Sequence, residues 1–198
     1  RNISDLVYFS KYFFLIKECC EDAQEYMPDY LDEIIEKIIT CLNSIKTPNS
    51  KSPLFNGATE INMEKYFNYL RGLNYDSKIS KNKIGQIFVF KNKRVSLFFD
   101  VGSPPKKKFS NNYQSGPLSF EYYVDTQKII TNCGFGKKIS KKTELISRLT
   151  SAQSTLCIND TSVVKFERNS LLKKIFGVAI KSSFKTYDFH LNEENDCL

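Results

Sequence analysis

The sequence predicts an α+β or two-domain protein in which helices come first and β-strands follow. Apolar residues keep a helical spacing up to about residue 72. From about Gly85 onward the apolar segments become short and extended, with turn-forming residues between them. The two types of segment do not alternate, as they would in a parallel α/β sheet, so the helices and strands belong to separate layers or domains.

The first two helices are predicted to form an antiparallel hairpin. Ser4 is the candidate cap of the first helix, and apolar side chains fill most of residues 6–16. Pro28 opens the second helix, and residues 31–45 hold an i, i+3, i+4 rhythm of Leu and Ile. A pair of such helices cannot close a core alone, so other helices or a sheet must cover them.

A turn-rich segment over residues 47–53 ends the second helix. A third amphipathic helix then runs through Met63 and Leu70 and stops near Gly72. We expect it to pack beside the hairpin.

The second part of the chain predicts two β-hairpins, because pairs of extended apolar segments flank short polar turns. We also expect two single strands and one short helix. The hairpins pair residues 86–90 with 95–99 and 118–124 with 128–133, the single strands cover residues 155–158 and 176–180, and the helix covers residues 143–149.

Composition is that of an ordinary globular protein, with 41% hydrophobic and 26% charged residues among 198. Since no apolar run is long enough to span a bilayer, we expect no membrane insertion. The net charge of +7 is uneven, with −3 in residues 1–80 and +10 in residues 81–198. The basic second part would attract a polyanion, whether nucleic acid, a membrane surface or an acidic polysaccharide.

The six cysteines lack CxxC spacing, which favours free thiols and a reducing cytoplasm, with the periplasm as the alternative for a longer parent protein. A single histidine argues against a His-rich zinc site, and no glycine-rich phosphate loop is present. The sequence therefore predicts neither a metal nor a cofactor. The start at Arg1, without an initiator Met, suggests an internal fragment.

Three loop segments are candidates for a functional site. In residues 100–108, a predicted strand ends in a rigid turn with three consecutive cations, Lys106, Lys107 and Lys108. Such a charge run is more often a solvated loop, but it could also form a basic lip for anionic sugar rings. Residues 113–121 and 152–160 are loops that enter strands, and neither has a nucleophile and a base at diagnostic spacing. The aromatic residues follow core periodicities, so we predict no nucleic-acid partner.

Five short stretches in these segments occur in the order and at the spacing found in heparinase II/III-like proteins of the alphaproteobacterial type. They are residues 54–57 (LFNG), 100–105 (DVGSPP), 116–121 (GPLSFE), 132–134 (NCG) and 154–162 (STLCINDTS). The chain thus resembles this family across roughly residues 50–166. The resemblance implies the end of an α/α toroid of helical hairpins in residues 1–75, followed by the first part of an antiparallel β-sandwich in residues 84–198.

The resemblance also implies a chemistry, β-elimination in an acidic, uronate-containing polysaccharide or oligosaccharide. In such a reaction a base removes the C5 proton, a polar group neutralises the adjacent carboxylate, and an acid protonates the leaving oxygen. Members of the family use Tyr and His for these steps, in a cleft between toroid and sandwich.

The sequence departs from the family pattern where two histidines are usual, because Gln114 and Gln153 stand in their places. A glutamine amide can hydrogen-bond a carboxylate but cannot exchange a proton near neutral pH. We therefore expect Tyr113 to transfer the proton, with Gln114 beside it in the catalytic site, and Asn56, Gln153 and the three lysines of residues 106–108 to bind substrate. The alternative is a catalytically degenerate carbohydrate-binding or scaffold protein, in which both glutamines only satisfy loop backbone groups.

Overall fold

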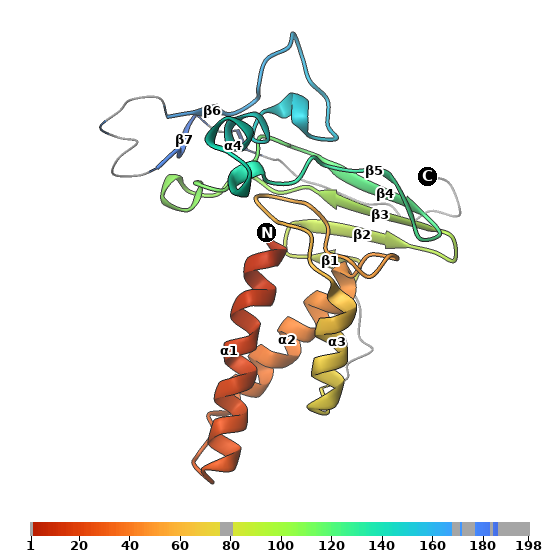
Figure 1. Ribbon diagram of the computed structural model, residues 1–198, viewed down its shortest axis with the longest axis vertical. Helices are drawn as coiled ribbons and strands as arrows, with labels where there is room; N and C mark the ends of the chain where they lie inside the picture. The colour runs from red at the N-terminus through yellow and green to blue at the C-terminus, as the bar shows by residue number, and fades with distance from the viewer. Residues whose placement is uncertain (1, 76–80, 168–170, 172–176, 183, 186–198) are drawn as a thin grey trace.

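The computed structural model describes residues 2–75, 81–167, 171, 177–182 and 184–185 (Figure 1). Three helices extend from one side of a five-stranded sheet, and loops with short helical turns lie on its other side. The helices are α1 (Ile3–Asp22), α2 (Asp29–Ile45) and α3 (Met63–Gly72). Among the loops lie α4 (Lys141–Ile146), a two-stranded ribbon of β6 (Lys165–Phe166) and β7 (Ile180–Ser182), and the 3-10 turns η1 (Lys107–Phe109), η2 (Gly136–Lys138) and η3 (Thr150–Ala152).

The helices begin at side-chain caps that the sequence only partly revealed. The Asn2 side chain accepts a hydrogen bond from the Asp5 N–H and caps α1, so the prediction of Ser4 as the cap is wrong. Ser4 lies inside the first turn, and its hydroxyl donates to the carbonyl of Thr59, 2.9 Å away. Helices α1 and α2 contact each other as an antiparallel hairpin, which confirms that prediction (Figure 1).

The sheet has the order β1-β2-β3-β4-β5, and every neighbouring pair is antiparallel. Both predicted hairpins are confirmed, one by β2 and β3 and the other by β4 and β5. The strands are β1 (Lys83–Ile84), β2 (Ile87–Lys91), β3 (Val95–Asp100), β4 (Phe120–Val124) and β5 (Gln127–Ile130).

The predicted strand over residues 155–158 is wrong. Ile158 forms only an isolated bridge with Thr161, because Asn159 and Asp160 both adopt positive φ and turn the chain back on itself. Leu156 points into solvent instead of a sheet. The last strand begins at Ile180 rather than at residue 176, which lies outside the described residues.

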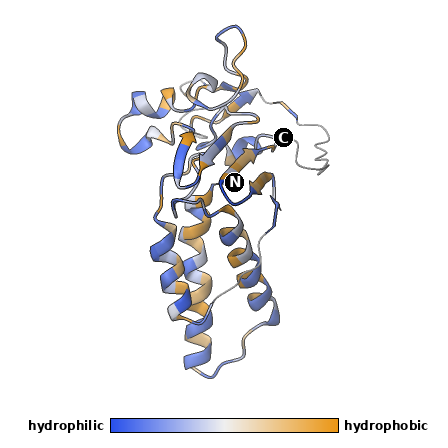
Figure 2. Ribbon diagram, turned by 90° about the vertical axis from the view of Figure 1, so that its right-hand side faces the viewer, coloured by the Kyte–Doolittle hydropathy of each residue, from blue (hydrophilic) through white to orange (hydrophobic). Residues whose placement is uncertain are grey.

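A continuous hydrophobic cluster, here called the apolar core, joins α1, α2 and α3 to strands β2, β3 and β4 (Figure 2). The alternation of buried positions along β3 and β4 and the i, i+4 stripe of α2 bring these side chains together. Its members are Ile3, Val7, Phe14, Leu31, Ile35, Ile39, Leu42, Ile45, Phe55, Met63, Tyr66, Leu70, Ile87, Val89, Phe98 and Tyr123.

The loops beyond the sheet, residues 101–119 and 131–167, are here called the loop region. Their apolar cluster is small: Tyr113 and Val164 pack with Ile180 of β7. The region instead buries many polar side chains, including Gln114, Ser115, Asn132, Ser147, Arg148, Thr150 and Glu167. Since buried polar groups require partners, hydrogen bonds must organise this part of the chain.

The side chain of Lys91 links the helices to the sheet by hydrogen bonds. The ammonium group of Lys91, at the end of β2, donates to the carbonyls of Ser44 (2.6 Å) and Lys46 (2.8 Å) at the end of α2. These carbonyls have no partner within the helix and carry the negative end of its dipole. Burial lowers the pKa of Lys91 to about 8.

Candidate functional site

The carboxylate of Glu121 on β4 is the centre of the hydrogen-bond network beside the sheet. Glu121 is fully buried, and its oxygens accept from the N–H groups of Leu54 (3.3 Å) and Asn132 (3.4 Å) and from the hydroxyl of Thr131 (3.0 Å). The ammonium of Lys128 lies 3.2 Å away and supplies the compensating charge that a buried carboxylate needs. Glu121 therefore connects three of the five family-like stretches.

Asn132 connects the next stretch. Its side-chain oxygen accepts from the N–H and the hydroxyl of Ser154, both at 3.1 Å. Asp100 joins the remaining one, because it accepts from the side-chain amide of Asn56 at 2.6 Å. All five stretches that carry the resemblance thus meet in one network, and most of their polar side chains bind backbone.

Gln114 is buried and holds three loops together. Its amide oxygen accepts from the Gly57 N–H at 2.9 Å, and its amide nitrogen donates to the carbonyls of Gly134 (2.7 Å) and Ser147 (2.8 Å). Gly57 has φ +86°, and a β-carbon there would lie 2.7 Å from Asn112, so only glycine fits this close approach. The loop that carries Asn56 is therefore fixed beside Gln114.

Gln153 lies beside Gln114 and is half-buried. Its amide nitrogen donates to the same Ser147 carbonyl at 2.7 Å and also contacts the Cys133 sulfur at 3.6 Å. Burial raises the pKa of the Cys133 thiol, so this group is not a prepared nucleophile. The structure thus brings Gln114, Gln153 and Asn56 together, with the glutamine amides directed at backbone groups.

Tyr113 precedes Gln114 and is 3% exposed, with its ring among Val164 and Ile180. Its carbonyl accepts from Nε of Arg148 at 2.8 Å, and a second guanidinium nitrogen donates to the Ser110 carbonyl at 2.9 Å. Arg148 is fully buried, and burial lowers its pKa to about 10, so the group remains charged at neutral pH. This arginine fixes the backbone that follows η1, at Ser110 and Tyr113.

The three consecutive lysines of residues 106–108 lie at the surface, in and beside η1. The Lys107 ammonium lies 3.8 Å from Glu167, and the Lys108 ammonium lies over the Phe109 ring at 4.8 Å from its centroid. They stand on the loop that Arg148 anchors at Ser110, so the network extends to the lysines predicted to bind substrate.

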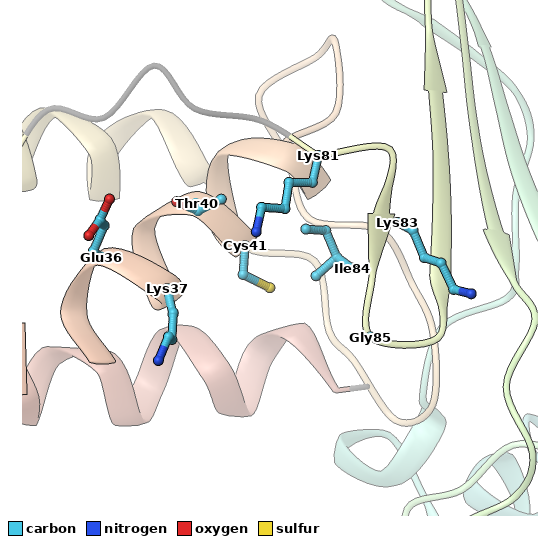
Figure 3. A pocket seen from close by; sticks show the side chains of 8 residues that line it. All are labelled: Glu36, Lys37, Thr40, Cys41, Lys81, Lys83, Ile84 and Gly85. Carbon is cyan, nitrogen blue, oxygen red and sulfur yellow. The ribbon is translucent and has the colours of Figure 1, made fainter. Parts of the chain in front are cut away.

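A cavity of about 430 Å³ lies elsewhere, between α2 and β1, and contains none of the predicted site residues. Figure 3 shows Lys81, Cys41 and Ile84 facing one another, whereas Lys37 and Lys83 point away from them. Burial raises the pKa of the Cys41 thiol to about 11. Its cations do not converge, so this cavity offers no organised anion site.

A family model described as heparinase II/III-like, C-terminal, matches residues 79–196. The chain belongs to the heparinase II/III-like family. This confirms the resemblance drawn from the five stretches. The search of curated proteins gave no match.

Two solved structures show the same fold as this heparinase II/III-like chain. The heparan sulfate lyase HepC from Pedobacter heparinus has a TM-score of 0.62 and 17% identity, over 83% of this chain and 31% of that one. A structure of heparinase III has a TM-score of 0.65 and 13% identity, over 83% of this chain and 33% of that one. The chain spans about a third of these structures. The fold class, helices of a toroid followed by an antiparallel sandwich sheet, is confirmed, while the division into residues 1–75 and 84–198 stays a prediction.

Sequence reasoning missed the two residues that organise the site most strongly. Glu121 lay within a recognised stretch, and its alternation with Tyr123 on a strand could have placed it on the buried face. Arg148 gave no such signal, because a charged residue near a short helix normally faces solvent.

Proposed function

We propose that this heparinase II/III-like chain forms part of a lyase-like protein that binds an acidic, uronate-containing polysaccharide. The observation that carries the proposal is the convergence of the five stretches of residues 54–162 on one network, within a family whose solved relatives are named heparan sulfate lyase and heparinase III. The network holds the basic loop of η1 at a fixed place, where ammonium groups can meet carboxylate or sulfate.

The assignment of individual residues follows from this proposal. Lys106, Lys107 and Lys108 would supply the field that attracts the sugar, and Asn56 and Gln153 would orient it. Tyr113 would transfer the proton with Gln114 at its side. Because Tyr113 is 3% exposed, such a transfer requires the loop around Val164 to move when substrate binds.

A second function, binding without catalysis, is favoured by a specific observation. Gln114 directs its amide at three backbone groups. By the resemblance to the family, it also stands where a histidine, which can exchange protons, is usual. A protein with this arrangement would hold an acidic polysaccharide and leave it intact.

The test uses the full-length protein and the ultraviolet absorbance of an unsaturated uronate product. Heparin, heparan sulfate, chondroitin, hyaluronan and alginate serve as substrates. We expect a rise in absorbance on at least one polymer, and we expect the Tyr113→Phe variant to lose at least about 100-fold in rate, as is typical when a proton-transfer group is removed.

The outcomes separate the two functions. A rise that Tyr113→Phe leaves unchanged would contradict the role of Tyr113 and place the chemistry on other residues. The absence of a rise on every polymer, together with binding that a triple Lys→Gln variant at residues 106–108 weakens, would establish the non-catalytic function. If the protein neither cleaved nor bound any of these polymers, both proposals would be contradicted.

A further inference from the structure

Residues 137–149, here called the α4 surface, combine exposed cations with exposed apolar side chains. Within six residues the chain places four exposed lysines, Lys137, Lys138, Lys141 and Lys142, in η2 and at the start of α4. Ile139 stands between the two lysine pairs with 78% of its surface exposed. Leu145, Ile146 and Leu149 follow and are 46%, 49% and 39% exposed.

This arrangement is built into the fold. The Ser140 hydroxyl accepts from the Thr143 N–H at 3.0 Å and caps α4, so Lys141 and Lys142 occupy its first turn. Leu145 and Ile146 lie four residues later, directly below the two lysines on the same exposed side of the helix. At Gly136 a β-carbon would come within 2.6 Å of Thr143 backbone, so η2 packs closely against α4 and both lysine pairs belong to one surface.

The four cations are available to a partner. Among the residues that the structure describes, no ion pair involves any of these four lysines. Glu144 is the acidic residue nearest in sequence. Its single negative charge is outnumbered by the four lysines, two on each side of Ser140. The surface also lies on the opposite side of the sheet from α1, α2 and α3 (Figure 1).

We propose that the α4 surface docks on an anionic lipid membrane. Lysines attract acidic headgroups, and the apolar side chains between them enter the boundary between headgroups and acyl chains. The exposed apolar side chains favour lipid over polysaccharide, because a polyanionic sugar has no hydrocarbon region in which an exposed isoleucine could be buried. None of the described helices is long and apolar enough to cross a bilayer, so the contact is peripheral.

The experiment is co-sedimentation of the full-length protein with vesicles of phosphatidylcholine alone or mixed with phosphatidylglycerol. We expect binding only to the mixed vesicles. Lys141→Gln with Lys142→Gln should weaken it roughly 30-fold, from about fivefold for each lysine. The matched control is Lys65→Gln with Lys93→Gln, which removes the same charge from exposed positions elsewhere and should leave binding within about twofold.

The apolar contribution has its own matched pair. Ile139→Ser should weaken binding roughly threefold, whereas Ile129→Ser, which changes a 59% exposed isoleucine on β5, should not. The exposed apolar residues of α1 are the same in all four variants, so any contribution from them cancels. Circular dichroism melting confirms that each variant is folded.

Three results would overturn the proposal. One is no binding to mixed vesicles. Another is an equal loss of vesicle binding in the Lys141/Lys142 and Lys65/Lys93 double variants, which would show that binding depends only on net charge. The last is binding to dextran sulfate that depends on Lys141 and Lys142, with vesicle binding insensitive to Ile139→Ser, which would make the surface a polyanion site. The proposal does not rest on lyase-like activity.

Discussion

In the apolar core, Leu42, Ile45 and Phe98 are fully buried among hydrocarbon side chains, whereas the fully buried side chains of the loop region include Arg148 and Asn132. Both regions exclude water, but they are stabilised differently. Hydrophobic burial is non-directional and tolerates small shifts, while a buried polar network depends on the position of each donor and acceptor. The loop region that carries the candidate site is therefore the more precisely positioned part and also the more easily disrupted one.

The largest effect should come from the apolar core. Phe98→Ala would leave a cavity against Tyr123, whose ring lies 5.7 Å away, and should lower the free energy of unfolding by about 4 kcal/mol. Phe109→Ala is the control, since this ring is 69% exposed and should cost less than about 0.5 kcal/mol. Urea denaturation measures both, and similar losses in the two variants would break the comparison.

In the loop region the corresponding change is Arg148→Met, with an expected loss of about 3 kcal/mol. The variant keeps most of the side-chain volume but leaves the buried carbonyls of Ser110 and Tyr113 without their charged donor. Amide hydrogen exchange should quicken in the loop region and stay unchanged in α2. Uniform acceleration throughout the chain would mean that the two regions unfold as one unit.

A smaller difference separates the two glutamines. Gln114→Leu removes three hydrogen bonds from buried backbone groups and should cost about 2 kcal/mol. Gln153→Leu removes one from a half-buried position and should cost less than about 0.5 kcal/mol. Thermal denaturation of the two variants provides the measurement, and the reverse order would show that the Ser147 carbonyl depends mainly on Gln153.

The smallest expected effect is a pH dependence of stability caused by Lys91, whose ammonium group binds the carbonyls at the end of α2. Its pKa is about 8 in the folded chain and near 10.5 when unfolded, so between these values the unfolded state binds more protons and stability rises with pH. Relative to Lys91→Met, the wild-type chain should gain stability from pH 8 to pH 10. The side chain is partly exposed, so the gain should stay below about 1 kcal/mol. A stability of the wild-type chain relative to Lys91→Met that falls as the pH rises would contradict the lowered pKa.

The contrast between regions also explains what could be predicted from the sequence. The i, i+4 stripe of α2 and the short apolar segments of β2 and β3 predicted these elements, because the burial of hydrophobic side chains leaves a local pattern in the sequence. The same pattern predicted a strand at residues 155–158, but the chain turns directly after them, where Asn159 and Asp160 have positive φ angles. It could not find the roles of Glu121 or Arg148, since a hydrogen-bond network joins residues far apart in sequence and leaves no period.

For the candidate site, resemblance located the segments, and the structure supplied the contacts. The sequence predicted Asn56, Gln114 and Gln153 as site residues. It did not indicate that Gln114 and Gln153 donate to the same acceptor, the Ser147 carbonyl. It also placed Tyr113 in a loop, which is correct, but it did not show that the ring is buried beside Val164. Such placements depend on how loops cross, which pattern analysis of a single chain does not address.

The shared acceptor has an evolutionary consequence. Since the Ser147 carbonyl has two lone pairs and receives two glutamine amides, one donor can be lost while the oxygen stays satisfied. Position 153 is therefore free to diverge first, while a change at position 114 simultaneously releases the loop of Gly57. The two positions should show epistasis, in which the cost of replacing Gln114 depends on whether residue 153 still reaches Ser147.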